Sequence, residues 1–252
     1  MSQFFTPLCR ISLSSVLLLC CFLMGCKHHE QSSAGESEEV LKFQAQKHLQ
    51  NKKYQSAIEP LQHLSHNHLG SSEAQVYKLE LMHAQYQARE FMAAVDSADQ
   101  YLLLYPYEPD VDYAMYMKMI ASLKEFESRQ WVPKIVQQKY SYTETEVLES
   151  ALGVSEHLIT SYPDSQYHQA AIVVQNEIKE IFQRKNFAIA RHYRRKQAYA
   201  ASQRRLTDII INTNSKKLLY KSLRMMYDNY MSMKQLRDAE VIAQLLRKNY
   251  HV

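Results

Sequence analysis

The sequence predicts an all-α fold, a helical repeat solenoid of about five helix pairs, and three observations support it. One spacing of apolar and small side chains recurs five times along the chain. Only 4 of the 252 residues are glycine, which favours helices joined by short turns over segments that need an unusually free backbone. No segment of useful length alternates apolar and polar side chains as a half-buried strand does.

The first 25 residues resemble a signal peptide. Arg10 precedes an apolar run, ISLSSVLLLCCFLM, at residues 11–24. This run is shorter than the ~20 residues that cross a bilayer, and it matches the apolar core of a secretion signal. It ends in Leu-Met-Gly followed by Cys26, which resembles the bacterial lipobox. The resemblance implies cleavage before Cys26 and attachment of a diacylglycerol and an N-acyl chain to that cysteine; a buried helix or an uncleaved anchor is the alternative.

Residues 26–37 are expected to form a lipidated cysteine and a flexible tether, because KHHEQSSAGES at 27–37 is polar and small. Lys27 follows the cysteine, where an Asp would usually retain a lipoprotein in the inner membrane. The lipobox therefore implies an anchor in the outer membrane, at its periplasmic face. No cysteine follows Cys26, so we expect no disulfide framework and no thiolate metal site in the body of the protein.

From about residue 38 the chain repeats one helical pattern. Four positions at 3-4-3 spacing lie on one face of a helix. The second position is always small, which predicts close approach of a neighbouring helix. The five sets are Tyr54-Ala57-Leu61-Leu64, Phe91-Ala94-Ala98-Tyr101, Leu148-Ala151-Ser155-Leu158, Tyr199-Ser202-Leu206-Ile209 and Leu236-Ala239-Ala243-Leu246.

Each of these helices is expected to follow a partner helix with its own apolar stripe. Tyr-Pro pairs at 105–106 and 162–163 mark helix ends, because proline cannot continue a helix and disfavours helix at the residue before it. A single long helix is expected over 166–196. The predicted stripes of the partner helices are Leu41, Ala45 and Leu49, then Val76, Leu79, His83 and Tyr86, and finally Leu219, Leu223, Met226 and Tyr230.

The spacing from Ala57 to Ala94 resembles the ~34-residue unit of the tetratricopeptide (TPR) repeat, which also pairs two helices. We therefore predict TPR-like repeats over 38–124 and 144–252. Residues 125–143, which include the only tryptophan, are predicted to be a loop inserted in the third repeat.

No catalytic or metal-binding pattern stands out. His63, His66 and His68 form the best metal candidate, but no acidic or thiolate residue accompanies them at ligand spacing, so a helix end at the surface is the preferred interpretation. Glu149 superficially resembles the catalytic glutamate of lytic transglycosylases, but its flanks continue the repeat pattern. We expect no enzyme activity, no metal and no cofactor.

A basic run occupies the fourth repeat. The formal net charge of +4 is mild and does not indicate binding to nucleic acid. Such runs usually form solvated faces, but arginine also pairs with carboxylates in a bidentate way, which suits docking of an acidic partner. The run comprises Arg184, Lys185, Arg191, Arg194, Arg195, Lys196, Arg204 and Arg205.

Three sets of residues resemble the BamD family, the lipoprotein subunits of the outer-membrane β-barrel assembly machine. One string is PDVDYAMYM at 109–117, in which Asp112, Tyr113 and Tyr116 match the family's segment between the second and third repeats. Another string is YPDSQY at 162–167, which opens the long helix in the family. The last set comprises Ala190, Tyr193, Ala198, Tyr199 and Arg205 in the fourth repeat.

This resemblance implies a lipid-anchored scaffold that helps outer-membrane proteins to insert and fold. The C-terminal repeats would dock on the periplasmic domains of a BamA-like barrel subunit, with Arg205 facing an acidic group and Arg204 and Tyr193 nearby. The N-terminal repeats would receive unfolded outer-membrane protein clients, and other lipoproteins of the machine can bind as well. The chain departs from the family at Gln197, where glycine is usual, and at Asn214, where the fourth repeat lacks its terminal proline.

Another periplasmic TPR lipoprotein is the alternative. Such a protein would serve as a scaffold for peptidoglycan enzymes, pili or envelope signalling. The same helical repeats and the same lipobox fit both functions. Binding to acidic domains of the barrel subunit separates the two.

Overall fold

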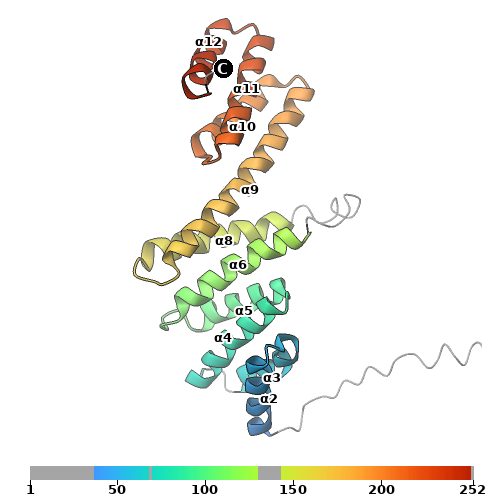
Figure 1. Ribbon diagram of the computed structural model, residues 1–252, viewed down its shortest axis with the longest axis vertical. Helices are drawn as coiled ribbons and strands as arrows, with labels where there is room; N and C mark the ends of the chain where they lie inside the picture. The colour runs from blue at the N-terminus through green and yellow to red at the C-terminus, as the bar shows by residue number, and fades with distance from the viewer. Residues whose placement is uncertain (1–36, 68–69, 130–142, 251–252) are drawn as a thin grey trace, which may run out of the picture. The chain divides into compact units, whose positions relative to one another are not determined.

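The computed structural model describes residues 37–67, 70–129 and 143–250. The predicted signal peptide, Cys26 and the tether up to residue 36 lie outside the described residues. Residues from Glu38 onward form one compact unit. Its described part contains ten α-helices and no strand (Figure 1), which confirms the predicted all-α fold.

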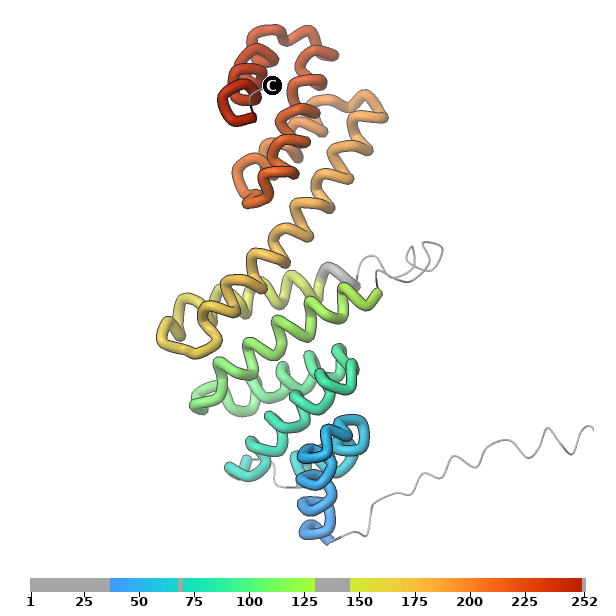
Figure 2. The backbone as a smooth tube through the Cα atoms, in the orientation of Figure 1, coloured from blue at the N-terminus to red at the C-terminus, as the bar shows by residue number. Residues whose placement is uncertain are grey.

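The ten helices form five consecutive pairs. Within a pair the two helices pack against each other, and each pair contacts the next along the chain (Figure 2). This arrangement confirms the predicted number of repeats. The pairs are α2 (Glu38–Gln50) with α3 (Tyr54–Asn67), α4 (Ser72–Gln87) with α5 (Phe91–Leu104), α6 (Val111–Arg129) with α8 (Thr143–Ser161), α9 (His168–Arg195) with α10 (Tyr199–Asn212), and α11 (Lys216–Ser232) with α12 (Leu236–Tyr250).

The small residues of the recurring pattern are buried as predicted. Ala57, Ala94, Ala151 and Ser202 are fully buried, and Ala239 is 2% exposed. A side chain of one or two heavy atoms lets the backbones of packed helices approach closely, and these positions therefore set the distance between helices. The fifth set departs at its first position: Leu236 is 64% exposed, because α12 is the last described helix and packs mainly on α11.

The stripe predicted for α4 is wrong at Val76, whereas Leu79, His83 and Tyr86 are half-buried and two of them, Leu79 and Tyr86, pack against the core. Val76 is 52% exposed, whereas the buried face of α4 carries the polar Lys78 and Gln85 beside Leu81 and Met82. Lys78 remains satisfied in this position because its Nζ donates a hydrogen bond of 2.6 Å to Gln100 Oε1 on α5. Because two buried positions of this helix carry polar side chains, the pattern of apolar residues in the sequence does not mark its whole buried face.

Left-handed residues close the turns inside four of the five pairs. Lys52, Arg89, Gln197 and Lys234 have φ between 55° and 66°, in the region that glycine adopts most easily. In each of these turns the next residue donates its backbone N–H to a carbonyl of the preceding helix, as Ala198 does to Tyr193 at 3.0 Å. The absence of glycine at Gln197 is thus compatible with the turn, at a conformational cost.

Helix α9 joins two parts of the core. It spans 28 residues, and this confirms the long helix predicted over 166–196 with bounds that differ by one or two residues. Ala171 and Ile178, near its start, pack into the clusters that contain residues of α6 and α8, whereas Ala190, near its end, packs with residues of α10 and α11. The third and fourth repeats are therefore connected through one continuous helix.

The insert of the third repeat is shorter than its predicted bounds of 125–143. Helix α6 continues to Arg129, and α8 begins at Thr143, so residues 125–129 are helical and not loop. The ion pair between Arg129 Nε and Glu125 Oε1, at 2.6 Å and i,i+4 spacing, supports the last turn of α6. Residues 130–142, including the tryptophan, lie outside the described residues.

Candidate functional site

Arg205 stands on the exposed surface of α10, beside α9. Its Nη1 donates a hydrogen bond of 3.4 Å to Asn186 Oδ1 on α9. Asn186 in turn donates from Nδ2 to Asp208 Oδ2 at 2.9 Å, which links both helices. Arg205 itself forms no ion pair with another described residue, so its guanidinium is oriented by the amide and keeps most of its donors available.

The two other residues predicted beside Arg205 occupy different positions. Arg204 is exposed on the same helix, but adjacent helical residues point in directions about 100° apart. Tyr193 lies in the last turn of α9 and is half-buried, with its ring 6.2 Å from that of His192. Asn186, the partner of Arg205, precedes Tyr193 by seven residues, or roughly 10 Å along the helix. Within the described residues, no hydrogen bond or ion pair links Arg204 or Tyr193 to Arg205, whose partner is Asn186.

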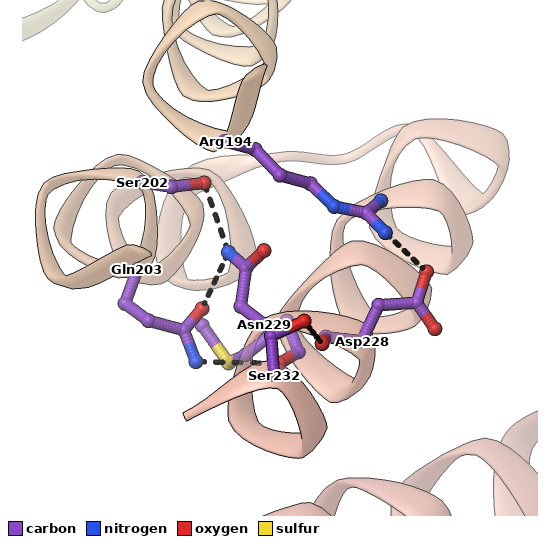
Figure 3. A network of polar contacts seen from close by, with 7 residues as sticks. Arg194, Ser202, Gln203, Asp228, Asn229 and Ser232 are labelled. Atoms are coloured by element: carbon purple, nitrogen blue, oxygen red, sulfur yellow. Dashed lines mark hydrogen bonds and ion pairs between the residues drawn. The ribbon is translucent and has the colours of Figure 1, made fainter. Parts of the chain in front are cut away.

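The basic run divides among separate environments. Arg184 pairs with Glu180 on α9 at 3.1 Å. Arg194 instead reaches α11 and pairs with Asp228 Oδ2 at 3.2 Å, as Figure 3 shows. The run is therefore not one continuous docking face, and Arg194 contributes to packing between the fourth and fifth repeats.

A buried polar network lies at the same junction (Figure 3). Asn229 on α11 is fully buried, and its Nδ2 donates to Ser202 Oγ at 2.9 Å and to Gln203 Oε1 at 3.4 Å. Gln203 Nε2 donates to the carbonyl oxygen of Met226 at 3.3 Å. The spacing pattern predicts Ser202 only as a small packing residue and does not predict this network; the asparagine beside the apolar face of α11 is the one sequence signal for it.

The two strings that carry the family resemblance meet in one joint. Ser165 Oγ, just before α9, donates a hydrogen bond of 2.5 Å to Asp112 Oδ2 at the start of α6. The rings of Tyr116 and Tyr167 stack with centroids 5.0 Å apart, and Tyr113 also contacts Tyr167 at 5.5 Å. Burial raises the pKa of Tyr113 to about 12. These residues thus hold the third repeat against the start of the long helix.

A pocket of about 370 Å³ opens between the first three repeats. Tyr54 and His83 meet edge to face in it, with ring centroids 5.7 Å apart. Burial lowers the pKa of His83 and raises the pKa of Glu80, so both groups favour their neutral forms. The pocket suits an apolar or aromatic side chain. Its lining residues are Leu49, Tyr54, Leu79, Glu80, His83 and Tyr113.

The predicted metal and catalytic candidates gain no support from the described part of the chain. It holds no group of three or more His, Cys, Asp or Glu side chains arranged for a metal ion. His66 Nδ1 lies 2.9 Å from the carbonyl oxygen of Gln62, and His68 lies outside the described residues. Glu149 is exposed on α8. Among the same helices, none has the length and apolar character needed to cross a membrane.

The five helix pairs define the class of this protein as a helical-repeat protein. A family model described as YfiO, outer membrane lipoprotein, matches residues 35–245. Because this match covers most of the chain, the chain belongs to the YfiO family, also called BamD. The predicted family is thereby confirmed.

Relatives named outer membrane protein assembly factor BamD extend over nearly the whole chain. The relative from Pasteurella multocida is 25% identical over 223 residues, which are 88% of this chain and 83% of the relative. The relative from Neisseria meningitidis serogroup B is 24% identical over 243 residues, or 96% and 90% of the two chains. These names do not favour the alternative of a scaffold for peptidoglycan enzymes, pili or signalling.

Proposed function

We propose that this protein is a lipid-anchored assembly factor for outer-membrane proteins and acts by binding, as a scaffold. The family match over residues 35–245 carries this proposal. The joint between Asp112 and Ser165 supports it, because two strings that resemble the family, 53 residues apart in sequence, form one contact. Depletion of the protein in its host tests the function: the amounts of β-barrel proteins in the outer membrane should fall. Unchanged amounts would contradict it.

The anchor of the scaffold is Cys26 in this proposal. The lipobox Leu-Met-Gly-Cys at 23–26 supports it, and several acyl chains on one cysteine suffice for stable attachment to a bilayer. The Cys26→Ser variant should move from the membrane fraction to the soluble periplasmic fraction. A variant that stays with the membrane would show that another part of the protein provides the attachment.

Arg205 is the proposed contact to the periplasmic domains of the barrel-forming subunit. Its guanidinium is exposed and oriented by Asn186, without an ion pair to any described carboxylate. A planar guanidinium with free donors pairs well with a carboxylate of a partner. Arg204 offers a matched control, since it has the same charge and exposure on the same helix but points in another direction.

The pocket between the first three repeats is the proposed site for a client segment. Its aromatic and aliphatic lining accepts an apolar side chain of an unfolded outer-membrane protein, and burial lowers the pKa of His83 there, which favours its neutral form. A photoreactive side chain at Leu79 should crosslink to unfolded client during assembly. The same group at Glu59, an exposed position outside the pocket lining, serves as the control. Equal crosslinking at both positions would exclude the pocket as the site.

A further inference from the structure

A second cavity, of about 420 Å³, lies between α9 and α11. Four of its lining side chains are cationic: Arg184 and Arg191 come from α9, and Lys217 and Lys221 come from α11. Arg205 does not line this cavity. The cavity is therefore a feature separate from the contact proposed for the barrel subunit.

The four cations converge on the cavity from two sides. Arg184 and Arg191 are seven residues apart, which places them two turns apart on one face of α9. Lys217 and Lys221 are four residues apart, which places them on one face of α11. Both faces border the same cavity, and the four exposed cations therefore line a single open volume from two helices instead of forming a line along one helix.

The positive charge in this cavity is only partly balanced. Glu180 also lines it and pairs with Arg184 at 3.1 Å. Four cations and one carboxylate leave a net charge of 4 − 1 = +3. Within the described chain, Arg191, Lys217 and Lys221 form no ion pair. Convergent like charges repel one another, and an anion in the cavity would relieve this repulsion.

The start of α11 adds to the positive potential. Ser215 lines the cavity and caps this helix, with its Oγ accepting a hydrogen bond of 3.4 Å from the Leu218 backbone N–H. The first N–H groups of a helix carry partial positive charge and attract anions. Phe187 and the nearly buried Leu218 supply an apolar wall to the cavity.

We propose that the cavity between α9 and α11 binds a ligand through its phosphate group. A phosphate concentrates more than one negative charge on a single compact group. Such a group can meet cations that line one cavity from both α9 and α11. An acidic peptide fits less well. Its carboxylates on the same side of an extended chain are about 7 Å apart, so they would match cations arranged in a row and not cations on two sides of one cavity. The phosphate can belong to a lipid headgroup or to a small soluble molecule.

Isothermal titration calorimetry on the full chain, extracted in a neutral detergent, tests this proposal. The probes are glycerol 3-phosphate and dihexanoyl phosphatidic acid, which carry the same phosphate monoester and differ in the acyl chains. The double variant Lys217→Glu/Lys221→Glu should lose at least tenfold in affinity for both probes. The control Arg237→Glu/Lys248→Glu changes the net charge equally at exposed positions of α12 and should keep the affinity.

The outcomes separate the sources of the phosphate and the competing explanations. Tighter binding of the lipid probe assigns the site to a lipid headgroup, and equal binding assigns it to a soluble phosphate. No binding of either probe, or equal losses in both double variants, would overturn the proposal. Tighter binding of an acidic peptide than of glycerol 3-phosphate would also overturn it. If the double variant does not fold, the single variant Lys221→Met replaces it, and its thermal unfolding shows whether it is folded. This variant removes one of the four positive charges and should still lower the affinity for both probes.

Discussion

Asn229 and Ser202 form a fully buried hydrogen bond of 2.9 Å between α11 and α10. The bond ties the fifth repeat to the fourth, because the amide nitrogen of Asn229 reaches both Ser202 and Gln203 on α10. The ion pair between Arg194 and Asp228 crosses from α9 to the same helix, α11. Polar contacts thus add to the apolar cluster that joins the fourth and fifth repeats.

Removal of the buried amide should weaken this junction. The Asn229→Ala variant leaves Ser202 Oγ and Gln203 Oε1 without their donor and opens a cavity, so we expect a loss of about 2 kcal/mol in the free energy of unfolding. Urea unfolding followed by circular dichroism measures it. Asn249→Ala, which removes an exposed amide bonded to its own helix, should cost less than about 0.5 kcal/mol. Equal losses in the two variants would contradict a special role of Asn229.

The contact between the two segments that resemble the family, residues 109–117 and 162–167, should show energetic coupling. Asp112 and Ser165 share a hydrogen bond across 53 residues of sequence, so the single variants Asp112→Ala and Ser165→Ala should not have additive effects. A double-mutant cycle on unfolding free energies should give a coupling of about 1 kcal/mol. Additive effects would mean that the contact contributes nothing to stability and that these residues have another role.

Gln197→Gly should stabilise the protein. Gln197 has φ of 59° in the turn between α9 and α10, and a residue with a Cβ pays roughly 1 kcal/mol for this conformation. The expected increase in the free energy of unfolding is up to about 1 kcal/mol. The neighbouring Lys196 has φ of −84°, so Lys196→Gly should destabilise the protein instead. The opposite order of the two variants would refute this explanation.

The pocket of the N-terminal repeats should make stability depend on pH. Burial lowers the pKa of His83 in the folded state, so below its ordinary value of about 6.5 the unfolded chain binds more protons than the folded chain. The contribution of His83 to the free energy of unfolding is therefore fully present above pH 6.5. It falls as the pH drops towards the lowered pKa of the folded state. Urea unfolding at pH 7.5 and 5.5 should show a larger loss for the wild type than for His83→Gln.

A control separates Glu80 from this effect. Burial raises the folded pKa of Glu80, so this group acts with the opposite sign: its contribution is present below its ordinary pKa and is lost as the pH rises through the raised value. The comparison should therefore be repeated in a Glu80→Gln background. If His83→Gln leaves the pH dependence unchanged in both backgrounds, His83 is accessible enough to titrate normally.

The fold could be predicted further than the site. Recurring small residues such as Ala57 and Ala94 revealed the helix pairs, because close packing allows little else at those positions. Part of the buried face of α4 was not predicted, because the polar Lys78 and Gln85 occupy it and Gln100, the hydrogen-bond partner of Lys78, lies on α5. Arg191 and Lys221 line the same cavity although 30 residues separate them in the sequence. Their proximity depends on tertiary packing, and in the sequence each looks like an ordinary surface charge.

The most direct test of the central claim is co-purification from membranes. The tagged full chain, extracted in mild detergent, should recover a large barrel protein with periplasmic domains. The Arg205→Leu variant should recover clearly less of it, and Arg204→Leu should recover the wild-type amount. Recovery of cell-wall enzymes or pilus components, with no barrel protein, would contradict the proposed assembly function while leaving the helical-repeat fold in place.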